Sequence, residues 1–380
     1  MLRMVGKKDR LGLRTWIEID KKAISNNVTQ FKRLLPKNCL FCAVVKSNAY
    51  GHGLADFSKE VATKVDYLAV DSIVEAVHLR DSGIKTPILV LGYTLPEMYK
   101  NASLNNIEIT ISSVEQLEFL KKVKDIKLKI HLKIDTGMHR QGFLIDDVSK
   151  CLSLLTKIKN ISIVGVYTHF ASAKNPAFPE HTKKQINIFE KAISMIRERG
   201  YSPIVHASAT SGAIVFPNTY FDMVRIGIGL YGFWPSPEVF AYAKHKMDLK
   251  PVLSWRTIIS EIKEIKEDSG VGYDMVDNVK KGTKIAICPV GYWHGYSRAL
   301  SSIGEVLVCG QRARIVGRVC MDMIMIDVTK IKNIKSGDVV TIIGKDGVDK
   351  ISAEYIAMIA DQSYYEFLTR INPLIKKILI

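Results

Sequence analysis

Several polar side chains stand where apolar runs of this 380-residue chain end, and their types suggest covalent and acid–base chemistry. Lys46 closes the run Ala43-Val44-Val45. An amine that is partly removed from water can be neutral and can form a Schiff base, although a lysine at a strand end more often exits to solvent. Comparable positions downstream hold more polar residues: His131, Lys133, Arg140, His169, Thr210 and Arg225.

The elements that must position these residues are eight short apolar runs with amphipathic helical patterns between most of them. Runs that are apolar throughout are typical of parallel strands covered on both faces. Eight such repeats predict an α/β fold, a TIM-like (β/α)8 barrel, whose active site lies at the carboxyl ends of the strands. The expected strands are Leu40–Lys46, Tyr67–Asp71, Ile88–Gly92, Ile107–Ile111, Leu128–Asp135, Ile161–His169, Ile204–Ala207 and Met223–Gly229.

The pattern changes after Lys250, where alternating β-like segments and turn dipeptides predict a mostly β C-terminal domain. We therefore expect a barrel domain over residues 15–250 and a β-rich domain over residues 251–380. The first strand, Thr15–Ile19, precedes a helix over Lys21–Leu35, and the sequence leaves open whether that strand pairs with the C-terminal domain. The expected later elements are strands Trp255–Ile265, Lys284–Pro289, Glu305–Val308, Ala313–Val319, Met323–Val328 and Val339–Gly344, and a helix Ser352–Ala360.

The net charge of +16 comes from lysines spread along the chain. Without a basic cluster or a nucleic-acid motif, this favours a solvated surface and predicts no nucleic-acid or membrane partner. The six cysteines are scattered, with Cys39 and Cys42 as a lone C-x-x-C, so we expect reduced thiols and no metal site. The segment Met1–Leu13 lacks a signal-peptide pattern and no long apolar span follows, which favours a cytoplasmic protein.

The segment from Lys46 to Gly53 closely resembles the signature around the cofactor-binding lysine of alanine racemases. Four further motifs are similar to that family, and they occur in its order from Ile17 to about Arg370. They are Lys133-Ile134-Asp135-Thr136-Gly137-Met138-His139-Arg140, Thr168-His169-Phe170, Arg225-Ile226-Gly227-Ile228-Gly229-Leu230-Tyr231-Gly232 and Arg318-Val319-Cys320-Met321-Asp322-Met323.

The resemblance implies an enzyme that interconverts L- and D-alanine with pyridoxal 5'-phosphate (PLP), through an external aldimine and two bases. Lys46 would hold PLP as a Schiff base and then serve as one base. The phosphate would be held by residues that resemble the family's phosphate ligands: Tyr50, Thr210, Gly227, Ile228 and Tyr365.

Arg225 would face the pyridine nitrogen of PLP. Because arginine only donates hydrogen bonds, that nitrogen would stay unprotonated, which disfavours transamination and favours simple return of the proton to Cα. His169 resembles the family histidine that we expect to hydrogen-bond Arg225.

The second base implied by the resemblance is Tyr273 of the partner subunit, in a homodimer with shared active sites. Arg140 would contact the PLP phenolate oxygen and the carboxylate of the amino-acid substrate, which would also meet the backbone N–H of Met321. Lys133 matches a lysine that is carbamylated in some relatives. The implied role is to supply D-alanine for peptidoglycan.

Three departures from the family pattern leave the breadth of substrates open. Ala209-Thr210 stands where an Asn-Ser pair is frequent, Trp293-His294 where Ala-Asp is usual, and Lys174 where an acidic residue is frequent. A racemase of another or several amino acids is therefore an alternative. A barrel-type PLP decarboxylase is a second alternative, against which Arg225 and the lack of a triple glycine argue, and a PLP-binding carrier without a β domain is a third.

Overall fold

The computed structural model describes residue 6 and residues 9–124, 126–159 and 161–380. Part of the segment Met1–Leu13, which lacks a signal-peptide pattern, lies outside the described residues. The chain forms two compact units. One contains Lys22–Ala49 and Leu54–Lys250, and the other contains Tyr50–Gly53, Pro251–Ile380 and the described residues up to Lys21.

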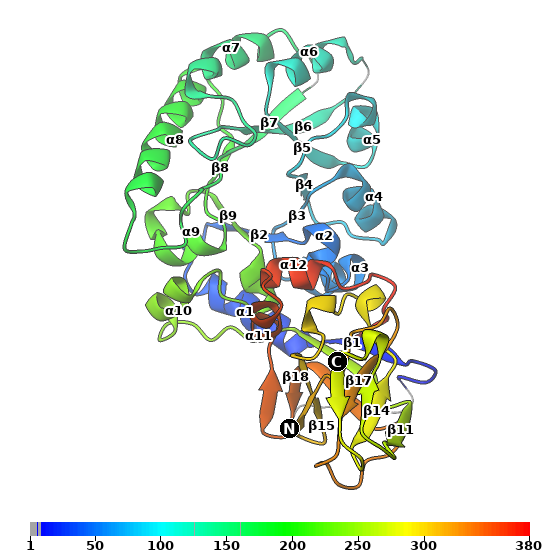
Figure 1. The fold of residues 1–380 in the computed structure, drawn as a ribbon. Helices are drawn as coiled ribbons and strands as arrows, with labels where there is room; N and C mark the ends of the chain where they lie inside the picture. The colour runs from blue at the N-terminus through cyan, green and yellow to red at the C-terminus, as the bar shows by residue number, and fades with distance from the viewer. Residues whose placement is uncertain (1–5, 7–8, 125, 160) are drawn as a thin grey trace. The chain divides into compact units, whose positions relative to one another are not determined.

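The first unit is built on a closed barrel of eight parallel strands, which Figure 1 shows as a ring with helices outside it. Each strand pairs with the next in chain order, and β2 pairs with β9 to close the ring. The prediction of a (β/α)8 barrel is thus confirmed. The strands are β2 Leu40–Val44, β3 Tyr67–Val70, β4 Ile88–Val90, β5 Ile107–Ile111, β6 Leu128–Lys133, β7 Ile161–Tyr167, β8 Ile204–His206 and β9 Met223–Ile226.

Helices follow the strands, and their starts have local causes. The Ser113 hydroxyl accepts the Gln116 N–H at 3.4 Å and caps α6, as expected for serine at this position. The helices are α1 Lys21–Lys32, α3 Leu54–Ala62, α4 Ile73–Asp81, α5 Tyr99–Leu104, α6 Val114–Lys122, α7 Ile145–Leu155, α8 Glu180–Glu198, α9 Thr210–Val215 and α10 Pro237–Ala243. The segment labelled α2, Lys46–Tyr50, is a short turn with left-handed backbone at Ser47, Asn48 and Ala49.

The barrel strands end earlier than the apolar runs suggest. β2 ends at Val44 and β7 at Tyr167, so that Lys46 and His169 lie in the connections after the strands. These connections leave the carboxyl ends of the strands, where barrel enzymes place their active sites.

The second unit is mostly β and contains the first strand of the chain. Thr15 of β1 pairs with Thr257 of β10, and Ile17 pairs with Lys377 of β20, so this strand belongs to the β-rich unit. A buried ion pair links the same strands, with Arg256 Nε 3.2 Å from Glu18 Oε2. The elements are β1 Thr15–Ile19, β10 Leu253–Ile258, β11 Glu261–Glu264, β12 Ser269–Val271, β13 Asp277–Val279, β14 Lys284–Cys288, β15 Glu305–Val308, β16 Gln311–Arg314, β17 Ile324–Asp327, β18 Val339–Asp346, β19 Asp349–Ile351, α11 Ala353–Ile359, α12 Tyr364–Thr369 and β20 Lys377–Leu379.

Two expected strands differ from the structure. The run Trp255–Ile265 is divided into β10 and β11, and only the start of Ala313–Val319 lies in a strand, β16. Gly317 explains the second difference, because it has a φ of 74° and a Cβ atom there would lie 2.6 Å from the Val271 carbonyl oxygen. This left-handed conformation ends extended pairing and brings the loop after β16 against the end of β12.

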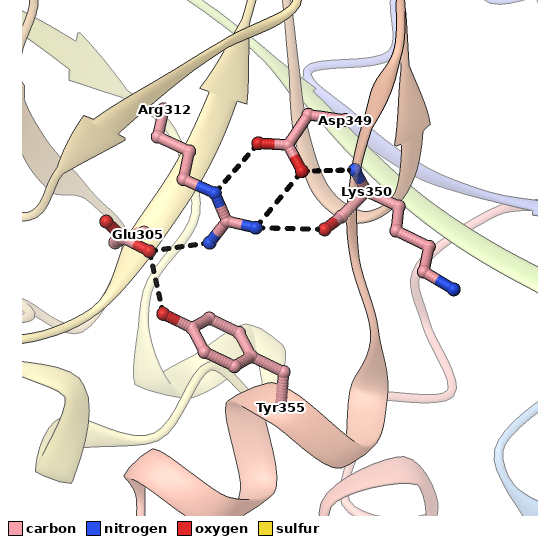
Figure 2. A network of polar contacts seen from close by, with 5 residues as sticks. All are labelled: Glu305, Arg312, Asp349, Lys350 and Tyr355. Carbon is pink, nitrogen blue, oxygen red and sulfur yellow. Dashed lines mark hydrogen bonds and ion pairs between the residues drawn. The ribbon is translucent and has the colours of Figure 1, made fainter.

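Figure 2 shows a polar network that joins β15, β16 and β19 to α11. Arg312 Nη1 donates to Glu305 Oε2 at 2.7 Å and Arg312 Nε to Asp349 Oδ2 at 2.8 Å. The Tyr355 hydroxyl donates to the same Glu305 oxygen at 2.7 Å. Two carboxylates raise the pKa of Arg312 above its usual range, and one guanidinium therefore ties three elements together.

Replacing Arg312 with methionine should lower the free energy of unfolding by on the order of 1 kcal/mol, because the network is partly exposed and solvent screens it. Lys263→Met is the control, since Lys263 forms a simple exposed pair with Glu261 at 3.5 Å. Urea unfolding followed by tryptophan fluorescence measures both. If the two substitutions lower the free energy of unfolding equally, the network around Arg312 stabilises the protein no more than an ordinary surface ion pair does.

Candidate active site

Lys46 begins a short left-handed turn after β2. Ser47, Asn48 and Ala49 have φ values of 55°, 55° and 51°, which L-residues adopt at a cost of about 1–2 kcal/mol each. Lys46 itself is half-exposed, and its Nζ lies 3.5 Å from Asp71 Oδ1. Consecutive residues in a strained conformation are typical of a functional loop.

The left-handed turn is held by hydrogen bonds from Glu75, in the first turn of α4, and from Asn48 of the turn itself. Glu75 Oε1 accepts the Asn48 N–H at 3.2 Å, and Glu75 Oε2 accepts the Asp71 N–H at 2.9 Å. Asn48 Oδ1 in turn accepts the Leu54 N–H at 2.8 Å. Together these bonds fix the direction in which the chain leaves Lys46.

Asp135 organises the loop that carries Arg140. Its Oδ1 accepts the backbone N–H groups of Gly137, Met138 and His139 at 2.9, 3.1 and 3.1 Å. The loop therefore turns tightly after β6, and Arg140 is exposed at its end.

Lys133, the last residue of β6, is buried among cations. Its Nζ donates to Gln141 Oε1 at 3.3 Å. Burial, and then the charges of Arg140, Arg225 and Lys46, lower the pKa of Lys133 to about 8. The four sequence-predicted cations thus lie near one another at one end of the barrel.

Arg225 of β9 is 2% exposed, and its guanidinium has buried acceptors on two sides. Nη1 lies 2.7 Å from His206 Nδ1, while Nη2 donates to the carbonyl oxygens of Thr168 at 2.7 Å and Ala207 at 2.8 Å. The assignment of His169 as the hydrogen-bond partner of Arg225 is therefore wrong. His206 has that place because it points into the barrel from the adjacent strand β8, whereas His169 lies beyond the end of β7.

His169 instead lies close to the cations. Burial, followed by the charges of Arg225, Arg140, Lys133 and Lys46, lowers the pKa of His169 to about 3. The imidazole is consequently neutral near pH 7 and can offer a hydrogen bond or a ring face without adding charge.

Thr210 joins the connections that follow β8 and β9. Its Oγ1 accepts the Gly227 N–H at 3.1 Å and the Gly229 N–H at 3.4 Å. Ile228 begins a 3-10 helix directly after Gly227 and is buried. Both bonds use the oxygen of Thr210, and within the described part of the chain no hydrogen bond uses its hydroxyl proton, which can therefore meet a bound anion.

Tyr50 and Tyr365 belong to the β-rich unit, where their ring centroids are 6.4 Å apart. Burial raises the pKa of both phenols above the usual value, with each other's proximity adding to the effect at Tyr50. Both hydroxyls therefore remain protonated hydrogen-bond donors.

Tyr273 and Met321 lie in adjoining loops of the β-rich unit and are 69% and 53% exposed. An ion pair connects the loops, with Arg318 Nε 2.7 Å from Asp274 Oδ2. The Met321 carbonyl accepts the Trp293 N–H at 3.0 Å. Among the described hydrogen bonds none uses the Met321 N–H, so this donor can meet a ligand.

The departures at residues 293, 294 and 174 have clear local settings. His294 Nδ1 accepts the Gly291 N–H at 3.2 Å and so closes the turn before Gly295. Burial lowers the pKa of His294, which keeps this nitrogen an acceptor. The Lys174 carbonyl accepts the Ser236 hydroxyl at 2.9 Å. None of these contacts involves Lys46, Lys133, Arg140 or Arg225.

The sequence analysis missed Tyr167 and His206, which both contact Arg225. The two rings stack with centroids 4.8 Å apart, and Arg225 Cζ lies 5.0 Å from the Tyr167 centroid. Both could have been found from the sequence, because each is a polar aromatic residue at the end of an apolar strand, directly before Thr168 or Ala207. Such a residue can face the barrel interior.

Among the described residues no group of three or more histidine, cysteine, aspartate or glutamate side chains could hold a metal ion. No helix within the described part of the chain is long and apolar enough to cross a membrane.

Comparisons with known proteins agree over nearly the whole chain. The family model for the alanine racemase N-terminal domain matches residues 19–235, and that for the C-terminal domain matches residues 252–379. The alanine racemase of Leptospira interrogans is 40% identical over 374 residues, which cover 96% of each chain. That of Methanococcus maripaludis is 40% identical over 370 residues, covering 96% of this chain and 98% of the relative.

Solved structures give the same result. The alanine racemase of Clostridium difficile 630 superposes with a TM-score of 0.91 at 34% identity, covering 97% of this chain and 96% of that one. The Bacillus anthracis alanine racemase with bound L-Ala-P gives a TM-score of 0.91 at 35% identity, covering 97% and 95%. The chain therefore belongs to the alanine racemase family of PLP-dependent isomerases.

Proposed function

We propose that this chain interconverts L-alanine and D-alanine with two bases, Lys46 of one subunit and Tyr273 of the partner subunit. The observation that carries the proposal is the buried Arg225, which offers only hydrogen-bond donors and has a histidine, not a carboxylate, beside it. This arrangement suits a racemase, since it leaves a neighbouring ring nitrogen unprotonated.

The donor set fits PLP. A guanidinium has five N–H donors, and the described bonds of Arg225 use three of them, so donors remain for the pyridine nitrogen. The Thr210 hydroxyl and the backbone at Gly227 and Ile228 suit a phosphate, and we assign Tyr50 and Tyr365 to it as well. When bound, PLP withdraws electrons from the Cα atom of the amino acid and so acidifies its Cα–H bond.

The acid–base steps fall to two groups of the protein. The Lys46 amine takes the Cα proton on one face, and the Tyr273 hydroxyl of the partner subunit gives a proton on the other. The reverse direction exchanges these roles, which is the requirement for racemisation of either enantiomer.

Substrate orientation falls to Arg140 and Met321. The Arg140 guanidinium attracts the substrate carboxylate and the PLP phenolate oxygen, and the Met321 N–H donates to the same carboxylate. His169, neutral because its pKa is low, contacts the cofactor without adding charge. Lys133 stands at the same end of the barrel, where carbamylation would exchange its positive charge for a negative one beside Arg140.

We further propose that two chains form a homodimer, in which the barrel unit of one subunit, Lys22–Ala49 and Leu54–Lys250, faces the β-rich unit of the other. Support comes from apolar side chains that are exposed on adjoining loops of the β-rich unit, since surfaces of this kind mark interfaces. They are Tyr273, Met275, Val276, Tyr292, Trp293, Met321 and Met323.

In this proposal the enzyme works in the cytoplasm and supplies D-alanine for peptidoglycan. A racemase of another or several amino acids is the alternative, because Trp293, His294 and Lys174 depart from the family pattern. A decarboxylase is less well supported, because a carboxylate at the pyridine nitrogen would have to replace Arg225.

Two measurements on the purified holoenzyme test the proposal. Borohydride reduction followed by peptide mapping should attach pyridoxyl to Lys46, because this lysine lies just after barrel strand β2 and near the other cations. Conversion of enantiomers should be fastest with alanine in a panel of amino acids. Label on another lysine would overturn the cofactor assignment, and faster turnover of serine or lysine would favour the broader racemase.

A further inference from the structure

A series of buried side chains, each hydrogen-bonded to the next, runs across the barrel interior from Glu108 of β5 to Arg225. The Glu108 carboxylate Oε2 lies 2.8 Å from His131 Nε2, and His131 Nδ1 lies 2.9 Å from His206 Nε2. His206 Nδ1 then lies 2.7 Å from Arg225 Nη1. Glu108, His131, His206 and Arg225 are 3%, 0%, 0% and 2% exposed, so water does not complete any of these bonds.

The barrel leaves space for this series of side chains at Gly165. Strand β7 lies between β6 and β8, and Gly165 pairs with His131. A Cβ atom on Gly165 would lie 2.0 Å from His131 Nδ1. The imidazole of His131 can therefore reach past β7 to His206 only because this strand has no side chain there.

The positions of the protons in this series of side chains follow from the groups at its two ends, Arg225 and Glu108. Arg225 can only donate, so His206 Nδ1 must be an acceptor and its proton must be on Nε2. That proton requires His131 Nδ1 to accept, which puts the His131 proton on Nε2. This last N–H needs an acceptor, and the ionised Glu108 carboxylate supplies one.

The opposite arrangement fails at Arg225. A protonated Glu108 would donate to His131 Nε2, and His131 Nδ1–H would donate to His206 Nε2. His206 Nδ1–H would then oppose an Arg225 N–H, leaving two buried donors face to face at a cost of about 1–3 kcal/mol. Whether Glu108 accepts the His131 Nε2 proton thus decides whether Arg225 has an acceptor.

Other charged and aromatic groups around these side chains are consistent with hydrogen bonds donated from Arg225 toward Glu108. Lys129 Nζ lies 3.9 Å from the other Glu108 oxygen, Oε1. Burial and the nearby Glu108 raise the pKa of Tyr67 above its usual range, which leaves its phenol protonated. Burial, and then Arg225 and His131, place the pKa of His206 well below its usual value. A neutral His206 is what the proton pattern requires.

We propose that Glu108 is a positioning residue for the racemase reaction, which acts through His131 and His206 to hold the Arg225 guanidinium in place. The proposal rests on the function proposed above, because its consequence is the contact of Arg225 with the pyridine nitrogen. The carboxylate balances the buried guanidinium across two neutral imidazoles, which avoids an acid beside the cofactor.

The proton pattern can be measured without the reaction. In protein labelled with 15N-histidine and freed of PLP, His131 and His206 should both show the neutral form with the proton on Nε2. His131→Gln and His206→Gln assign the signals. A proton on Nδ1 of either ring, or a doubly protonated ring near pH 7, would overturn the proposal whatever the enzyme catalyses.

Substitutions of Glu108 then test the consequence. Glu108→Leu removes the acceptor and should lower kcat roughly tenfold or more while changing KM little, because the loss of a charged hydrogen bond loosens Arg225. It should also shift the His206 nitrogen signals. Glu108→Gln should restore part of both, since its amide oxygen accepts the same bond.

Ile109→Ala is the matched control, because Ile109 is buried in the same strand and faces away from Glu108. It should lower stability yet leave the His206 signals in place. If Glu108→Leu affects kcat and the His206 signals no more than Ile109→Ala does, Glu108 has only a structural role. If the wild-type enzyme racemises no amino acid, the proposed function fails, and the NMR result still decides the proton pattern.

Discussion

Tyr273→Phe should lower racemisation of alanine about 10²–10⁴-fold while PLP stays attached to Lys46, because the substitution removes one of two general acid–base groups. The phenol is exposed in a loop of the β-rich unit and no cofactor contact is assigned to it, so the cofactor site is undisturbed. Initial rates in both directions and the absorption of bound PLP measure the two effects separately.

Solvent deuterium gives this experiment its sharpest result. In the variant, Lys46 should still take the Cα proton of one enantiomer and return deuterium to the same face. That enantiomer should therefore acquire deuterium without inversion, while the other exchanges far more slowly. Exchange of both enantiomers at wild-type rates would remove Tyr273 from the mechanism.

Met275→Leu is the control for disturbance of the loop. Met275 lies in the same 3-10 helix as Tyr273 and is 68% exposed, but it cannot transfer a proton. It should leave racemisation within about twofold of the wild-type rate. A loss comparable to that of Tyr273→Phe would mean that loop geometry, rather than the phenol, limits the rate.

The barrel was predictable because its strands are short, apolar runs with helical patterns between them. Periodicity does not fix where a strand ends, however, and the left-handed turn after Lys46 depends on Glu75 of α4 and on Asn48 within the turn. The division of Trp255–Ile265 was likewise hidden, since β-like residues continue through the break.

The partner of Arg225 could not be predicted by position along the chain. His169 follows an apolar run and looks like a site residue, whereas His206 lies inside one and looks like core. Which histidine reaches the guanidinium depends on which strand lies beside β9, and that is a property of barrel closure. The same holds for Glu108 and His131, whose burial becomes intelligible only with Gly165 between them and His206.

Mixing two inactive variants, Lys46→Ala and Tyr273→Phe, should restore activity if each site joins one subunit's barrel to the other's β-rich domain. In a mixed dimer one site collects both defects and the other collects neither. Half of the sites in mixed dimers should then work at the wild-type rate, which is about a quarter of all sites after random exchange in equal amounts.

The size of this effect makes it decisive, because each parent variant lacks an acid–base group worth about 10²–10⁴-fold. Activity should rise with the fraction of mixed dimers, which native mass spectrometry of differently tagged subunits reports. Mixing Lys46→Ala with a Lys46→Ala/Tyr273→Phe double variant is the control and should restore nothing. If mixed dimers form and activity does not return, each site is built within a single chain, and the exposed loops around Tyr273 serve another contact.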